Sequence, residues 1–118
     1  MQVERVDFIN IATRDPERSR AWYRKMLGVE QDPNNPDELT VGQTTLSFWN
    51  PEAEGYEFSR DIGGFAVRVA DVEQAKDELI AKGAECVGSG DTGACHMAVF
   101  LDPDGNAVLL HRRYRPYG

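Results

Sequence analysis

One stretch near the C-terminus decides the fold: Phe100-Leu101-Asp102-Pro103-Asp104-Gly105-Asn106-Ala107-Val108-Leu109-Leu110-His111. It holds two apolar runs separated by a tight turn. Pro103 fixes φ for the turn, Gly105 can adopt a positive φ, and the aspartates can accept hydrogen bonds from nearby backbone N–H groups. The flanking runs are rich in Val, Leu and Phe, which favours strands. The stretch therefore predicts a β-hairpin, with strands at 96–101 and 108–111.

Length and composition exclude several classes of protein. The 118 residues suit one domain, and a hydrophobic fraction of 41% is that of a folded chain. No apolar run reaches the roughly 18 residues of a membrane span, and residues 1–5 lack a signal-peptide core. We therefore expect a cytoplasmic protein without a membrane partner, with Cys86 and Cys95 reduced. A disulfide between these two cysteines is the alternative if they lie on paired strands. The formal net charge of −7 argues against a nucleic-acid partner and is compatible with a cationic ligand.

The first half predicts a strand, a helix and further strands. Asp15 is the expected N-cap of the helix, Pro16 its first residue, and Gly28 the residue that ends it. Strand patterns precede and follow it. The expected flanking elements are a strand at 3–13, a short edge strand or loop at 29–37, strands at 39–41 and 44–49, and a linker at 50–60.

The second half repeats this order. Phe65, Val67 and Val69 alternate with smaller or polar residues and predict a strand, after which Asp71 caps a helix that ends near Gly83. The further expected elements are a short strand at 84–87, a flexible loop at 88–93, the hairpin strands, and an irregular tail at 112–118.

The repeat sets the predicted fold class. The two capping aspartates, Asp15 and Asp71, lie 56 positions apart (71 − 15), and such repeats must be recognised before a fold is assigned. Each half predicts a βαβββ module, so the class is α+β. We expect the modules to form a curved mixed sheet around a cleft, with the helices outside. Residues 1–50 and 62–118 are the predicted modules, joined by a linker at 51–61 within a single domain spanning 1–118.

Three motifs carry a family resemblance: Ala21-Trp22-Tyr23 before Leu27-Gly28, the strand from Phe65 to Asp71, and Phe100 followed by Asp102-Pro103-Asp104-Gly105-Asn106. Together they resemble the vicinal oxygen chelate (VOC) superfamily, which holds glyoxalase I, extradiol dioxygenases, and fosfomycin- and bleomycin-resistance proteins. The resemblance covers nearly the whole chain. It implies paired βαβββ modules, often completed by dimerisation, so a homodimer is expected.

The resemblance also implies a metal site that this sequence does not supply. Catalytic members similar to this chain hold one divalent metal with His, Gln or Glu. The corresponding positions here are Phe8, Leu46 (or Ser47 after a one-residue shift), Gly64 and Leu109. Phenylalanine and leucine have no lone pair to offer a metal. His96 and His111 could at most form a poor two-ligand site, so we predict no metal and no other cofactor.

The cleft is predicted to be mostly apolar, as in sites for organic ligands. Gly64 is expected to leave room for a ligand, and Arg68 either pairs with an anionic ligand group or faces solvent. The predicted ligand-binding residues are Phe8, Asn10, Leu46, Phe48, Gly64, Arg68, Leu109 and His111.

Three functions follow, of which the first is favoured. The first is metal-independent binding of an aromatic or apolar small organic molecule, as in the bleomycin-type antibiotic-sequestering branch of the family that the chain resembles. The second is a VOC-type lyase, isomerase or dioxygenase. Such an enzyme is either metal-dependent or uses His111 or His96 as general base; its catalytic residues are unassigned. The third is a regulatory or structural subunit without a ligand. Fold-level resemblance alone does not choose among them.

Overall fold

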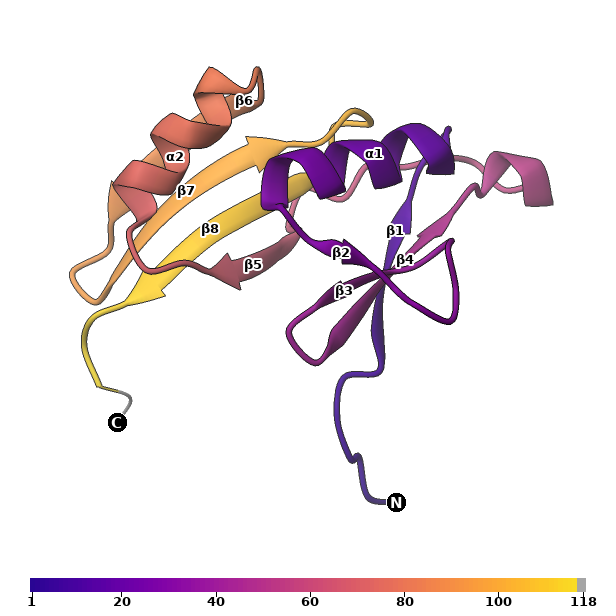
Figure 1. Cartoon of the computed structure of the whole chain (residues 1–118), viewed down its shortest axis with the longest axis horizontal. Coiled ribbons are helices and arrows are strands. Elements are labelled where there is room, and N and C mark those ends of the chain that lie inside the picture. The colour runs from indigo at the N-terminus through magenta and orange to yellow at the C-terminus, as the bar shows by residue number, and fades with distance from the viewer. Residues whose placement is uncertain (117–118) are drawn as a thin grey trace. The chain divides into compact units, whose positions relative to one another are not determined.

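A computed structural model describes residues 1–116 (Figure 1). The chain divides into two compact units, Met1–Ser59 and Arg60–Gly118. The boundary lies inside the segment 51–61 that the sequence predicts as a linker. Within the described residues, each unit contains one α-helix and one four-stranded sheet.

The first unit is a βαβββ module. Its strands run in the order β1-β4-β3-β2, with β1 parallel to β4 and the other neighbours antiparallel. The expected strand at 3–13 is too long, because only the segment that pairs with β4 is a strand. The elements are β1 (Phe8–Ala12), α1 (Pro16–Leu27), β2 (Glu30–Gln31), β3 (Leu39–Val41), β4 (Thr44–Trp49) and a 3₁₀ turn, η1 (Glu52–Glu54).

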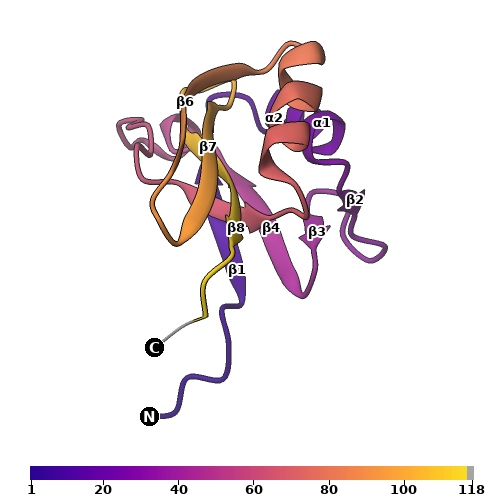
Figure 2. The ribbon, with the colours of Figure 1, turned by 90° about the vertical axis from the view of Figure 1, so that its left-hand side faces the viewer.

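The second unit repeats the same topology. Its strands run in the order β5-β8-β7-β6, again with one parallel pair, β5 with β8. Helix α2 packs on β6, β7 and β8 of its own module (Figure 2). The prediction of two βαβββ modules is confirmed. The elements are β5 (Phe65–Arg68), α2 (Val72–Ala81), β6 (Glu85–Asp91), β7 (Cys95–Leu101) and β8 (Ala107–Arg113).

Both helices begin where the sequence predicts. The Asp15 carboxylate accepts a hydrogen bond from the Arg18 N–H at 3.1 Å, and the Asp71 carboxylate accepts one from the Gln74 N–H at 3.0 Å. Each bond satisfies an N–H group that has no partner within the helix. Gly28 ends α1 in the left-handed conformation with φ 64°.

The predicted hairpin is present, and a buried polar cluster fixes its turn. Asp102 Oδ1 accepts hydrogen bonds from the N–H groups of Asp104 and Asn106, both at 2.9 Å. Asp102 Oδ2 accepts one from Asn106 Nδ2 at 3.0 Å. In turn, Asn106 Oδ1 accepts the Asp61 N–H at 2.8 Å, so the turn also holds the segment that leads into β5.

Two sequence-based predictions in this module are wrong. The segment 88–91, predicted as a flexible loop, belongs to β6, and the strand β8 continues through Arg112 and Arg113 instead of ending at His111. Both extensions pair with β7. In β6, this backbone hydrogen bonding outweighs the low strand propensity of Gly88 and Gly90. The last two residues of the expected tail, 117 and 118, lie outside the described residues.

The core of each module lies between its sheet and its own helix. In the first module, Tyr23 on α1 contacts Phe48 on β4, with ring centroids 5.5 Å apart. In the second, the fully buried Phe100 and Leu110 belong to β7 and β8. Side chains alternate between the faces of a strand, so the opposite side of each sheet has no helix of its own module over it. We call these sides the first and second open face. None of the helices within residues 1–116 is long and apolar enough to cross a membrane.

Candidate functional site

The first open face carries aromatic and small polar side chains. Strand pairing places Phe8 opposite Thr45, Asn10 opposite Ser47 and Ala12 opposite Trp49, and cross-strand partners share a face. Phe8 is 52% exposed and Trp49 is 38% exposed. These six residues define the first open face.

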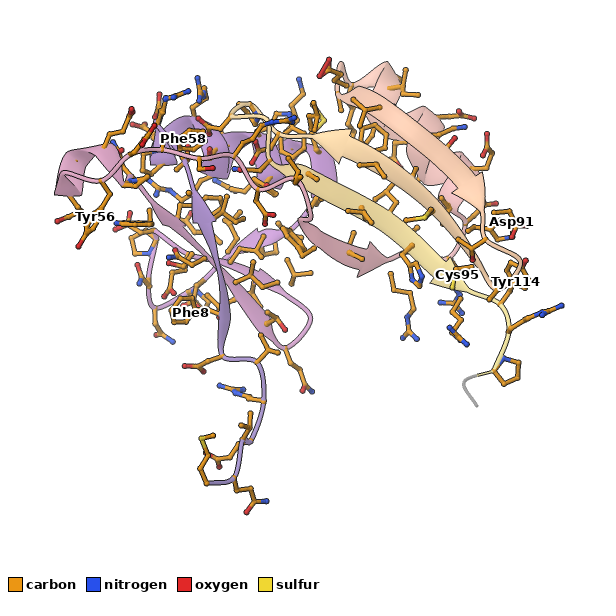
Figure 3. The ribbon with its side chains drawn as sticks, turned by 180° about the vertical axis from the view of Figure 1, so that it is seen from behind. Phe8, Tyr56, Phe58, Asp91, Cys95 and Tyr114 are labelled. Carbon is orange, nitrogen blue, oxygen red and sulfur yellow. The ribbon has the colours of Figure 1, made fainter. Side chains whose placement is uncertain are left out.

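Further aromatic side chains of this unit follow β4 in the sequence. Trp49 packs against Tyr56, with centroids 6.0 Å apart and planes at 60°, and the Arg14 guanidinium lies 4.3 Å from the centre of the Phe58 ring. Figure 3 shows Phe8, Tyr56 and Phe58 in this unit. Phe8, Trp49 and Tyr56 are the exposed rings among these residues.

Leu46 and Phe48 do not belong to this face, so their predicted placement beside Phe8 and Asn10 is wrong. Leu46 is fully buried, and Phe48 contacts Tyr23 of α1. The register pairs Leu46 with Ile9 and Phe48 with Ile11, which are on the helix side. The prediction is off by one residue along β4, and in a strand a shift of one residue reverses the face. Ser47 occupies the open position instead.

The second open face brings four strand positions together. Ala66 and Arg68 on β5 pair with Leu109 and His111 on β8. Strand β7 continues both rows, with Val99 opposite Leu109 and Met97 opposite His111. One row is thus apolar, and the next row holds Arg68, His111 and Met97. These six residues define the second open face.

Gly64 does not leave room for a ligand, contrary to the sequence-based expectation. It has φ 67°, and a β-carbon at this position would overlap the backbone carbonyl of Ala107. The Asp61 carboxylate accepts the N–H groups of Gly63 and Gly64, both at 3.0 Å. Glycine is required here because the backbone approaches β8 closely.

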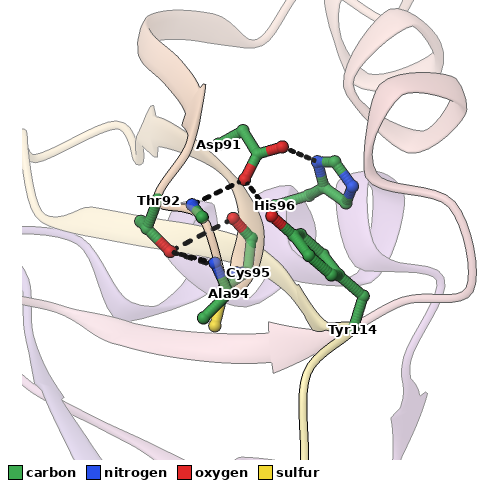
Figure 4. Close-up of polar contacts among 7 residues, drawn as sticks. Asp91, Thr92, Ala94, Cys95, His96 and Tyr114 are labelled. Carbon is green, nitrogen blue, oxygen red and sulfur yellow. Dashed lines mark hydrogen bonds and ion pairs between the residues drawn. The ribbon is translucent and has the colours of Figure 1, made fainter.

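The two histidines lie on opposite faces of the second sheet. His111 pairs with Met97, whereas His96 pairs with Arg112 and Asp91 on the side of α2. They cannot converge on one metal ion. His96 instead belongs to a surface cluster, in which its Nδ1 lies 3.8 Å from Asp91 Oδ2 and its ring lies 4.8 Å from that of Tyr114 (Figure 4).

Sequence reasoning missed the Asp91–Tyr114 contact. The Tyr114 hydroxyl donates a hydrogen bond to Asp91 Oδ1 at 2.6 Å. This bond, aided by the Gly93 N–H, lowers the pKa of Asp91 below its ordinary value. The same bond raises the pKa of Tyr114, because the carboxylate holds the phenolic proton. No local pattern relates residues 91 and 114, which the sheet brings together.

Replacing Tyr114 with phenylalanine is expected to raise the pKa of Asp91 toward its ordinary value. The stability that Asp91 contributes is present above the unfolded-state pKa and is lost as pH falls through the lower folded-state pKa. In the variant the folded-state pKa of Asp91 is closer to its unfolded-state value. Asp91 therefore contributes less to the free energy of unfolding above about pH 4. NMR titration of the Asp91 carboxyl carbon measures the shift. Y56F serves as the control, and an unchanged Asp91 pKa in Y114F would contradict the assignment.

A depression of about 440 Å³ lies on the helix side of the second sheet, near the start of α2. Its carboxylates already have structural partners. Asp71 caps α2, Glu73 lies 2.7 Å from Lys76 Nζ, and Asp91 accepts from Tyr114. These carboxylates are therefore already engaged within the module, and the predicted residues Arg68, Leu109 and His111 lie on the other side of the sheet.

Comparison with known proteins decides the family. The Glyoxalase/Bleomycin resistance protein/Dioxygenase superfamily matches residues 5–110. The chain belongs to this superfamily. A search of curated proteins finds no match to the sequence.

Solved structures of similar fold match this chain over nearly their whole length. An antibiotic-binding protein from Streptomyces sp. CB03234 has a TM-score of 0.79 at 21% identity, covering 96% of this chain and 98% of that one. A lactoylglutathione lyase from Agrobacterium tumefaciens has a TM-score of 0.77 at 16% identity, with 94% and 95% covered. A superfamily member from Sphaerobacter thermophilus DSM 20745 has a TM-score of 0.74 at 23% identity, with 92% and 97% covered. These likenesses show the fold.

The metal that catalytic members of the superfamily bind does not fit the residues present here. Phe8, Gly64 and Leu109 offer no donor atom, and Ser47 offers one hydroxyl. Among residues 1–116, no group of three or more His, Cys, Asp or Glu is placed to hold a metal ion.

Proposed function

We propose that this protein binds a small aromatic or apolar organic molecule on its open faces without the help of a metal ion. The second open face carries the proposal. It presents Val99, Leu109 and Ala66 in one cross-strand row and Met97, His111 and Arg68 in the next. An apolar surface with a few placed polar groups is the usual composition of a site for organic ligands.

The aromatic side chains of the first module support the same proposal. Phe8 and Tyr56 are 52% and 64% exposed, and such rings combine a large apolar surface with a defined stacking geometry. Neighbouring exposed apolar groups of this kind mark interaction sites more often than plain solvent-facing surface. A flat organic ligand matches them in shape and polarity.

The superfamily membership is compatible with this proposal. One structure of similar fold is described as an antibiotic-binding protein, so the scaffold serves binding in at least one case. At 21% identity, this likeness concerns the fold alone. The ligand of this chain is therefore inferred from its own residues.

Leu109→Ala is expected to weaken ligand binding about tenfold, because it removes apolar contact area at the centre of the second open face. An NMR titration of the ¹⁵N-labelled protein with a set of flat aromatic compounds identifies binders and locates them by their amide shifts. The matched control is Ile80→Ala, an aliphatic truncation on the exposed side of α2, where Ile80 is 48% exposed. Equal affinity in both variants would contradict the placement. If no compound shifts either open face, the protein is better described as a subunit without a ligand.

A second function is favoured by the pairing of Arg68 with His111 on the second open face. In an enzyme, a neutral His111 could accept a proton while Arg68 stabilises negative charge on a carbonyl oxygen. The two functions differ in one readout. If the protein is an enzyme, it converts a bound compound and His111→Asn abolishes that turnover. If it is a binding protein, the bound compound stays chemically unchanged in both the unaltered protein and the variant.

A further inference from the structure

We infer that the molecule bound on the second open face is an organic anion that carries a carboxylate beside its apolar body. This inference rests on the proposed function and specifies its ligand class. It is drawn from the charges on this one face, which differ from the charge balance of the whole chain.

Arg68 supplies the anion-binding group. It is an exposed residue of β5 and lies in register with His111 on β8, which in turn pairs with Met97 on β7. Among the residues that the structure describes, the Arg68 side chain takes part in no ion pair. Its planar guanidinium can therefore donate two parallel hydrogen bonds to a carboxylate.

The neighbouring positions contain no competing carboxylate. The six residues of the second open face are apolar apart from Arg68 and His111. Asp91, the acidic residue nearest along β6, pairs with His96 and belongs to the helix side of the sheet. Glu85 is opposite Leu101, at the other end of the β6–β7 pair. The local charge is therefore positive, because Arg68 carries a permanent positive charge and no carboxylate lies beside it.

The net charge of −7 does not oppose this assignment. Charges that are separated by more than about 10 Å in water at ordinary ionic strength are largely screened, so the nearest groups dominate. The apolar row beside Arg68 fits the organic body, and the guanidinium fits the carboxylate.

The test compares three probes of one shape: 2-naphthoate, 2-naphthamide and 2-naphthylmethylammonium. The NMR titration used for the proposed function gives each affinity and its location. We expect naphthoate to bind the second open face about tenfold more tightly than naphthamide, and the ammonium compound to bind most weakly. Raising the salt concentration should reduce the preference for naphthoate.

Variants assign the preference to Arg68. Arg68→Gln should bind naphthoate and naphthamide equally, and Arg68→Lys should keep part of the preference. The matched control Arg112→Gln removes the same charge from an exposed position of β8 on the helix side. This variant should keep the full preference for naphthoate over naphthamide. If naphthamide binds this face of the unaltered protein as tightly as naphthoate, the anion assignment is overturned while the proposed binding function stands. If none of the three probes shifts either open face, the proposed function fails with it.

Discussion

Gly64→Ala is expected to lower the free energy of unfolding by about 3 kcal/mol or more. Gly64 has φ 67°, a conformation in which any other residue is strained. The added methyl group would also overlap the carbonyl of Ala107, which is backbone and cannot rotate away. Either β8 or the segment before β5 must move. That movement would break the hydrogen bond from the Ala107 N–H to the Asp61 carbonyl, which is 2.8 Å long.

The neighbouring glycine provides the control. A β-carbon at Gly63 would meet only the Asp61 carboxylate, at an ordinary distance of 3.5 Å, and Gly63 does not have a positive φ. Gly63→Ala should therefore change stability by less than about 1 kcal/mol. Urea denaturation followed by circular dichroism measures both variants. Similar stability of the two variants would show that β8 does not approach Gly64 as closely as described.

Asp102→Ala is expected to destabilise the protein by about 3 kcal/mol, because it leaves buried donors without an acceptor. The Asp102 side chain is almost completely buried and accepts hydrogen bonds from two backbone N–H groups and from the Asn106 amide. Asn106 in turn binds the Asp61 N–H. Removing the carboxylate therefore loosens the β7–β8 turn and the entry to β5 together.

The exposed Pro103 in the same turn is the matched control. Pro103→Ala removes a conformational restraint and no acceptor, so the loss should stay below about 1 kcal/mol. The same urea experiment reports both changes. Asp102→Asn, which keeps one carbonyl oxygen, should fall between them. A loss from Asp102→Ala no larger than that from Pro103→Ala would mean that the turn is fixed by its backbone alone.

Elements that depend on local chemistry could be predicted from the sequence. The N-caps Asp15 and Asp71 and the turn around Gly105 involve residues within four positions of one another. The repetition of the two capping aspartates, 56 positions apart, also predicts the two modules. Local signals are read directly from the chain because the partner of each group is a near neighbour.

Features that depend on strand register could be predicted only in part. Leu109 and His111 share a face with Arg68, whereas Leu46 and Phe48 lie on the face opposite to Phe8 and Asn10, since one residue of slip reverses a strand. The strand β6 was missed beyond Val87 because its glycines lack strand propensity, and β7 alone supplies the pairing. The contact between Asp91 and Tyr114 and the close approach at Gly64 join residues far apart in sequence, for which a single sequence contains no signal.

The form of β6 has a consequence for solubility. This strand is at the edge of the second sheet, where a row of backbone donors and acceptors could recruit a strand from another molecule. The register of β6 shifts between Cys86 and Gly88. Gly88 and Gly90 also have no side chains to pack against a strand from another molecule. An irregular, glycine-containing edge is a poor template for intermolecular β-pairing. The same glycines that conceal the strand in the sequence thus protect the folded protein from aggregation along this edge.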